Sequence, residues 1–248
     1  MQQDTITFQI ATHYLPKIAL RLECLYQTIN QACEESHPVI HHYALKNVIE
    51  ILHIIDKPEL KSRFLKELMR IEHALLKSDK SISSDLSTDL HTQIQMLSHT
   101  VGLFGKGIHH DPFLQIFRQT LPTHNQDCEM HPPQLSFWLE SKSSLRQSDL
   151  SLWLTHLNPL YLTVELYLTL LRNTAQFDNL ALLNGFYQRS LPPKTQCHLI
   201  LLRINKSFGI VPRIQLGHHG LSLRLCEANN MREVKETNAK FDLAICQI

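Results

Sequence analysis

The stretch ALLNGFYQRSL, residues 181–191, separates two parts of the chain that have different hydrophobic patterns. It follows the most apolar run of the sequence, PLYLTVELYLTLL (159–171). Before it, apolar residues recur every three or four positions, which is typical of amphipathic helices. After it come short apolar or alternating segments separated by Pro and Gly, which is typical of strands. The sequence therefore predicts an α+β fold, with a helical domain over 11–180 and a β domain over 181–248.

About seven helices are expected in the helical domain, each with an apolar stripe at helical spacing. The last of them is apolar nearly all round, so we expect it to be buried in a core or between subunits, and we assign the dimer interface to it. The expected helices cover residues 15–29, 45–55, 58–75, 86–97, 111–121, 147–156 and 158–174.

The C-terminal part is expected to form an antiparallel sheet from segments 197–204, 211–216, 221–227 and 240–248. A short alternating segment at 6–10 is also predicted to be a strand. We expect it to join the C-terminal sheet, because a lone strand in a helical domain would leave its backbone polar groups unpaired. The segment QLSFWLE (134–140) fits either a helix or a strand, and we interpret it as a further strand.

The bulk composition is that of an ordinary globular protein, with 248 residues and a net charge of +1. A nearly neutral chain has no global attraction for nucleic acid or acidic membranes, so an electrostatic partner must meet a local patch. The six cysteines include no Cys-x-x-Cys pair, which indicates reduced thiols. No signal peptide is expected, and the apolar run 159–171 is shorter than the ~20 residues of a membrane helix. We therefore expect a cytoplasmic protein without membrane insertion.

The sixteen histidines do not form a motif for metal binding or catalysis. No His-Glu-x-x-His is present, and Pro38 argues against one helix through His37 and His41. We interpret the histidines as exposed loop residues and expect no metal, cofactor or catalytic residue. A histidine-dependent metalloenzyme stays open as an alternative.

Local charge is the more informative feature. Lys17 and Arg21 lie on the polar side of the first helix, and no acidic residue stands three or four positions from either. In LSLRLCE (221–227) the leucines share one face, so Arg224 is expected to face outward together with Ser222 and Cys226.

Arg213 and His218 lie close to Arg224 in the sequence. If strand 6–10 joins the sheet, Lys17 and Arg21 could approach Arg224 and form one basic groove from both ends of the chain. Scattered solvated charges would give the same pattern. A basic groove could also bind nucleic acid, although the near-neutral chain lacks the interleaved exposed aromatics expected there.

Several segments resemble the ZapD family of bacterial cell-division proteins over almost the whole chain. They are SFWL (136–139), W-x-x-x-LNPL (153–160) and LNGFYQ (183–188), preceded by LKNVIEIL (45–52) and FLKELMR (64–70). LNPL followed at this distance by LNGFYQ is the most specific of these features.

The resemblance implies a non-enzymatic homodimer that binds the C-terminal tails of FtsZ and bundles protofilaments in the Z-ring at mid-cell. It also implies a tail site made of basic residues between a helical and a β domain. The matching positions are Lys17, Arg21 and Arg224, and Arg118 lies where the family also tends to carry basic residues.

Overall fold

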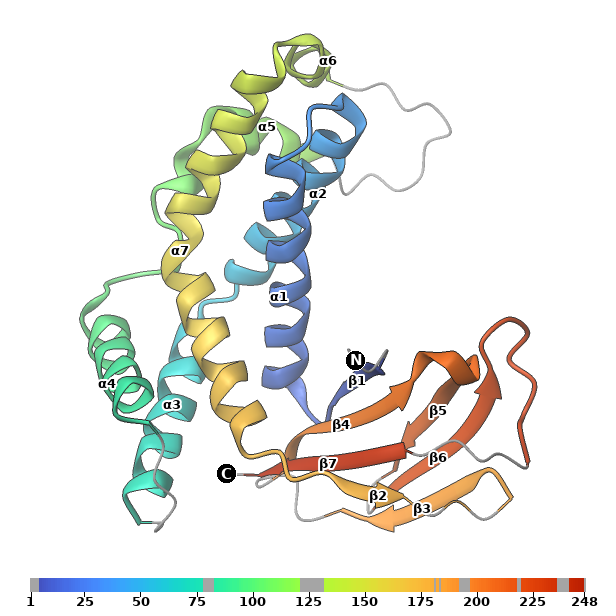
Figure 1. Ribbon diagram of the computed structural model, residues 1–248. Coiled ribbons are helices and arrows are strands. Elements are labelled where there is room, and N and C mark those ends of the chain that lie inside the picture. Colours follow the sequence, from blue (N-terminus) through green and yellow to red (C-terminus); the bar gives the residue numbers. More distant parts are fainter. Residues whose placement is uncertain are drawn as a thin grey trace. The chain divides into compact units, whose positions relative to one another are not determined.

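The computed structural model describes residues 5–77, 83–120, 132–180, 182, 184–191, 197–217, 220–235 and 241–247. The chain is α+β, as predicted: helices dominate the N-terminal part and antiparallel strands the C-terminal part (Figure 1). It forms two compact units, one of Met1–Ile18 with Leu168–Ile248 and the other of Ala19–Tyr167. The elements are β1 (Thr5–Ala11), α1 (Tyr14–Cys33), α2 (Pro38–Ile55), α3 (Glu59–Lys77), α4 (Ser84–His99), η1 (Ile108–His110), α5 (Pro112–Thr120), α6 (Pro133–Glu140), α7 (Ser143–Asn173), β2 (Asp178–Leu180), β3 (Phe186–Ser190), β4 (Cys197–Asn205), η2 (Lys206–Phe208), β5 (Ile210–Leu216), β6 (Gly220–Glu227) and β7 (Phe241–Gln247).

The helices of the Ala19–Tyr167 unit form where apolar stripes and capping residues coincide. His37 caps α2 by accepting a hydrogen bond from the Val39 amide at 3.2 Å, and Pro38 occupies the first helical position, where no amide donor is needed. Ser83 caps α4 in the same way. The predicted stripes supply the core: α3 packs against α4, and α2 packs against α5 and α6. The buried stripe residues are Leu22, Leu25, Ile29, Leu45, Val48, Leu52, Ile55, Leu60, Phe64, Leu68, Ile71, Leu90, Ile94 and Leu97.

The segment 134–140 is helical, so its interpretation as a strand was wrong. Pro133 starts the helix at its first position, and the buried side chains are Leu135 and Trp138, three residues apart. A strand would have placed Leu135 and Phe137 on the same face. Instead, Phe137 is 82% exposed.

The two helices expected at 147–156 and 158–174 are one continuous helix, α7, with Pro159 inside it. A proline in a helix interior costs about 3 kcal/mol. Leu157, Leu160 and Val164 are all buried at helical spacing across this point, so apolar burial offsets that cost. The described ranges contain seven α-helices, and none of them is long and apolar enough to cross a membrane.

The strands form two antiparallel sheets within the unit made of Met1–Ile18 and Leu168–Ile248. The larger sheet has the order β1-β4-β7-β2, and the smaller has the order β3-β6-β5. The prediction that the N-terminal strand joins the C-terminal sheet is confirmed, since β1 pairs with β4 from Thr5 opposite Asn205 to Ala11 opposite Leu199.

One apolar core joins the two sheets. β6 contributes Leu221, Leu223 and Leu225, and β4 contributes Ile200 and Leu202 from the larger sheet. Because alternate residues of a strand face opposite ways, Ser222 and Arg224 of β6 lie on the other face.

Cys226 shares the face of Arg224, but it is buried and was wrongly expected to be outward. The segment after β6 returns alongside it, because Glu233 forms an isolated bridge with Cys226 and the Val234 amide donates to the Leu225 carbonyl at 2.9 Å. Two further cysteines are buried in the larger sheet, and burial raises the pKa of Cys197 and Cys246 to about 11. Both thiols are therefore protonated and poorly reactive at neutral pH.

Asn184 and Gly185 connect the two sheets. Both have a positive φ, 52° and 70°, and they separate β2 of the larger sheet from β3 of the smaller one, so they do not form a hairpin. A Cβ added to Gly185 would lie 1.8 Å from the Val234 carbonyl oxygen. Only glycine fits this close approach between two backbone segments.

We expect Gly185→Ala to lower the free energy of unfolding by more than about 3 kcal/mol or to prevent folding, because the added carbon overlaps backbone that cannot move without breaking the pairing around Val234. Gly209→Ala is the matched control: its φ is also positive, at 60°, but nothing lies within 4 Å of the added carbon. Its cost should be only about 1 kcal/mol. Urea denaturation of both variants measures the difference, and equal losses would show that the close approach to Val234 is unimportant.

Candidate functional site

The smaller sheet places two of the predicted basic residues side by side. Arg224 of β6 lies directly opposite Arg213 of β5 and opposite Phe186 of β3. Residues directly opposite each other in an antiparallel sheet share one face, with Cβ atoms about 5 Å apart. Both arginines are exposed, so the face carries a row of one aromatic ring and two guanidinium groups.

Arg224 has partners within the chain. Its Nη1 donates to Glu233 Oε2 at 2.9 Å, and its guanidinium carbon lies 5.2 Å from the centre of the Phe186 ring. The ion pair is exposed, at 53% for the Arg224 side chain and 45% for Glu233, so it contributes little to stability. For Arg213, no side-chain partner occurs in the described part of the chain.

Arg21 also has a carboxylate partner, which comes from another helix. Its Nε and Nη2 donate to the two oxygens of Glu50 in α2 at 2.7 and 2.6 Å. This bidentate hydrogen bonding is the main cause that raises the pKa of Arg21. The local sequence around Arg21 did not reveal this partner, because Glu50 lies 29 residues further along the chain.

Arg118 of α5 pairs with Asp56, which follows α2. Lys17 is exposed on α1, and no partner of its side chain occurs within the described ranges. His218 lies outside the described residues. Lys17, Arg213 and Arg224 belong to one compact unit and Arg21 and Arg118 to the other, so a groove shared by them stays a prediction.

The interpretation of the histidines as exposed loop residues was wrong for His41 and His198, which are buried. His41 Nε2 lies 3.1 Å from the Ala32 carbonyl oxygen and 2.9 Å from that of Glu35, so this nitrogen carries the proton. The other ring nitrogen accepts a hydrogen bond from Arg146 Nε at 2.8 Å. Three or more His, Cys, Asp or Glu side chains do not gather into a possible metal site anywhere in the described ranges.

Arg146, near the start of α7, is itself buried. Besides His41, it donates to the Ser36 and Leu139 carbonyl oxygens, each at 2.8 Å, and to the Ser141 carbonyl. It thus ties the α1–α2 and α6–α7 connections to two helices. The contacts of His41 and Arg146 are therefore structural.

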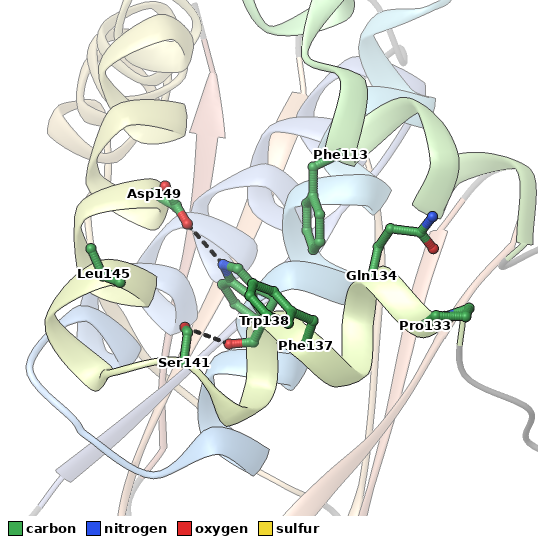
Figure 2. A pocket seen from close by; sticks show the side chains of 8 residues that line it. All are labelled: Phe113, Pro133, Gln134, Phe137, Trp138, Ser141, Leu145 and Asp149. Atoms are coloured by element: carbon green, nitrogen blue, oxygen red, sulfur yellow. Dashed lines mark hydrogen bonds between the residues drawn. The ribbon is translucent and has the colours of Figure 1, made fainter.

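A pocket of about 680 Å³ opens beside α6, in the Ala19–Tyr167 unit. Figure 2 shows that Trp138 donates to the Asp149 carboxylate, with 2.8 Å from Nε1 to Oδ2, and that Ser141 donates to the Trp138 carbonyl oxygen. Trp138 also belongs to an aromatic cluster with Phe113 and Trp153. The pocket lining contains none of the predicted basic residues and consists of Phe113, Pro133, Gln134, Phe137, Trp138, Ser141, Leu145 and Asp149.

Comparison with known proteins identifies the class. A family model described as "ZapD: Cell division protein" matches residues 20–224. A cell division protein ZapD of Coxiella burnetii is 28% identical over the full length of both chains. One of Nitrosomonas europaea is 26% identical over 94% of this chain and 91% of its own, and one of Serratia proteamaculans is 27% identical over 92% of each.

These matches define a cell division protein. The chain belongs to the ZapD family, as its sequence motifs predicted.

We expect Arg146→Met to lower the free energy of unfolding by about 2–4 kcal/mol, because it leaves buried carbonyl groups and His41 Nδ1 without their donor. Lys46→Met on the exposed side of α2 is the control and should change stability by less than about 0.5 kcal/mol. Urea denaturation followed by far-UV circular dichroism measures both variants. A loss no larger than that of the control would contradict the structural role of Arg146.

Proposed function

We propose that this chain is a non-enzymatic adaptor that binds the C-terminal tail of FtsZ and bundles protofilaments in the division ring at mid-cell. Membership of the ZapD family supports a role in cell division. The observation that carries the proposal further is the exposed row formed by Arg213, Arg224 and Phe186. A guanidinium group binds a carboxylate through two parallel hydrogen bonds, and the neighbouring ring offers an apolar contact. The row thus suits an extended peptide that carries acidic and apolar side chains.

Bundling requires each particle to hold two tails, which a homodimer achieves with one site per subunit. A polymer presents many tails, so a weak site becomes effective once the second site of the dimer engages intramolecularly. In the segment 158–174, most apolar side chains, including Leu160 and Val164, are buried within the chain, whereas Leu162 is exposed. A dimer interface on this segment would therefore use Leu162.

Lys17, Arg21 and Arg118 are further residues that we propose to contact the tail. Arg21 and Arg118 already hold carboxylates of the chain, which shows that both can bind a carboxylate in the geometry they adopt. Their present partners are exposed or half-buried, so an acidic tail could replace them at a modest cost. His218, which lies outside the described residues, is the remaining residue that we propose to contact the tail.

Co-sedimentation with GTP-polymerised FtsZ tests the proposal. We expect the chain to pellet with intact FtsZ and not with FtsZ that lacks its C-terminal tail, and we expect the pelleted fraction to fall as salt rises, because ion pairs of this kind are screened over ~8–10 Å. Arg224→Glu should reduce the pelleted fraction at least about fivefold, since it replaces attraction by repulsion at the row.

Arg232→Glu is the matched control. It makes the same charge reversal on an exposed residue of the same unit, outside the row. Equal losses for the two variants would indicate an effect of net charge alone. Pelleting that is independent of the tail would contradict the proposed function.

A further inference from the structure

We propose that Glu233 competes internally with the bound tail for Arg224, so that it sets the strength and selectivity of the Arg213–Arg224 site. The inference rests on the proposed function, because it concerns the same surface. It assigns a role to a residue that neither the motifs nor the charge pattern of the sequence singled out.

The local charge around Arg213 and Arg224 is unbalanced. Two arginines directly opposite each other on neighbouring strands repel, which is unfavourable unless a carboxylate lies between or beside them. Glu233 supplies one carboxylate, at 2.9 Å from Arg224 Nη1. Arg213 has no acidic partner within the described ranges, so this arrangement holds two guanidinium groups and one carboxylate. A second carboxylate would balance the charge of the two guanidinium groups.

The backbone of Glu233 is held in place more firmly than its side chain. Its backbone is fixed beside β6, because the Glu227 amide donates to the Arg232 carbonyl and the Val234 amide to the Leu225 carbonyl, each at 2.9 Å. Its carboxylate, by contrast, is exposed, and within the described ranges Arg224 is the side chain that binds it. The side chain can therefore rotate away from Arg224 while the backbone pairing stays intact.

The unbalanced charge and the exposed Glu233 carboxylate together define the ligand. A carboxylate that replaces Glu233 gains only the difference between two similar ion pairs, so a single contact with Arg224 is weak. A carboxylate placed between Arg213 and Arg224 contacts both guanidinium groups, which Glu233 does not do in this structure. The site thus favours an acidic side chain positioned between the two arginines, with an apolar neighbour on the Phe186 ring.

Binding of a fluorescently labelled FtsZ C-terminal tail peptide to the full chain, measured by anisotropy, tests the inference. Glu233→Gln should bind the peptide about two- to fivefold more tightly than the unmodified chain, which corresponds to removal of one exposed competing ion pair. Arg213→Gln should bind it several-fold more weakly, and it should do so in the Glu233→Gln background as well.

Glu227→Gln is the control, because it removes the same charge from β6, the strand beside which Glu233 lies. Glu227 lies three residues from Arg224 and therefore on the opposite face, where it accepts a hydrogen bond from Asn230. The inference predicts a clearly smaller gain for Glu227→Gln than for Glu233→Gln.

Equal gains would overturn the competition between Glu233 and the tail while leaving tail binding itself intact. Unchanged binding in Arg213→Gln would likewise overturn the two-arginine site. If the unmodified chain failed to bind the peptide at all, both the proposed function and this inference would fall.

Discussion

The alternation of β6 is the constraint on which the exposed basic row depends. Leu221, Leu223 and Leu225 are fully buried between the two sheets, and this fixes Arg224 on the opposite face. A shift of the pairing by one residue would bury Arg224 and expose three leucines. The pairing register of β6 is therefore strongly specified. The positions of Arg213 and Phe186 follow, because both are set by their pairing with β6.

The family motifs supply buried residues and a tight backbone contact to this fold. The tryptophans of SFWL and W-x-x-x-LNPL, Trp138 and Trp153, are buried in the aromatic cluster of the helical unit. Gly185 of LNGFYQ lets the chain pass from one sheet to the other against Val234. The motif residues thus stabilise the fold. The charged residues proposed to bind the partner lie outside the motifs.

Much of the fold could be predicted from the sequence, because local periodicity reflects burial directly. The apolar stripes of α1 to α4 and the alternation of β1 and β6 are local patterns of this kind. Segment 134–140 was misassigned because seven residues contain too few apolar positions to separate the two periods, and Pro133, directly before the segment, was given too little weight. The expected break between two helices before residue 158 was also wrong. Burial on both sides of Pro159 is a tertiary effect, and it overrides the local preference.

The site could be predicted only in part. The outward position of Arg224 followed from alternation, but its partner Glu233 and the Arg21 partner Glu50 are brought in by strand pairing and helix packing. The same holds for His41, whose burial depends on an arginine 105 residues away. Arg21, Arg118 and Arg224 each bind a carboxylate of their own chain. The number of predicted arginines therefore overstated the free positive charge at the surface.

The most direct test of the account is to map the bound tail on the protein by nuclear magnetic resonance. Amide spectra of the isotopically labelled chain would be recorded with and without the FtsZ tail peptide. The account predicts that the largest shift changes occur in β5 and β6 around Arg213 and Arg224 and at Glu233. Changes confined to the pocket around Phe137 and Trp138, with the smaller sheet unaffected, would contradict it.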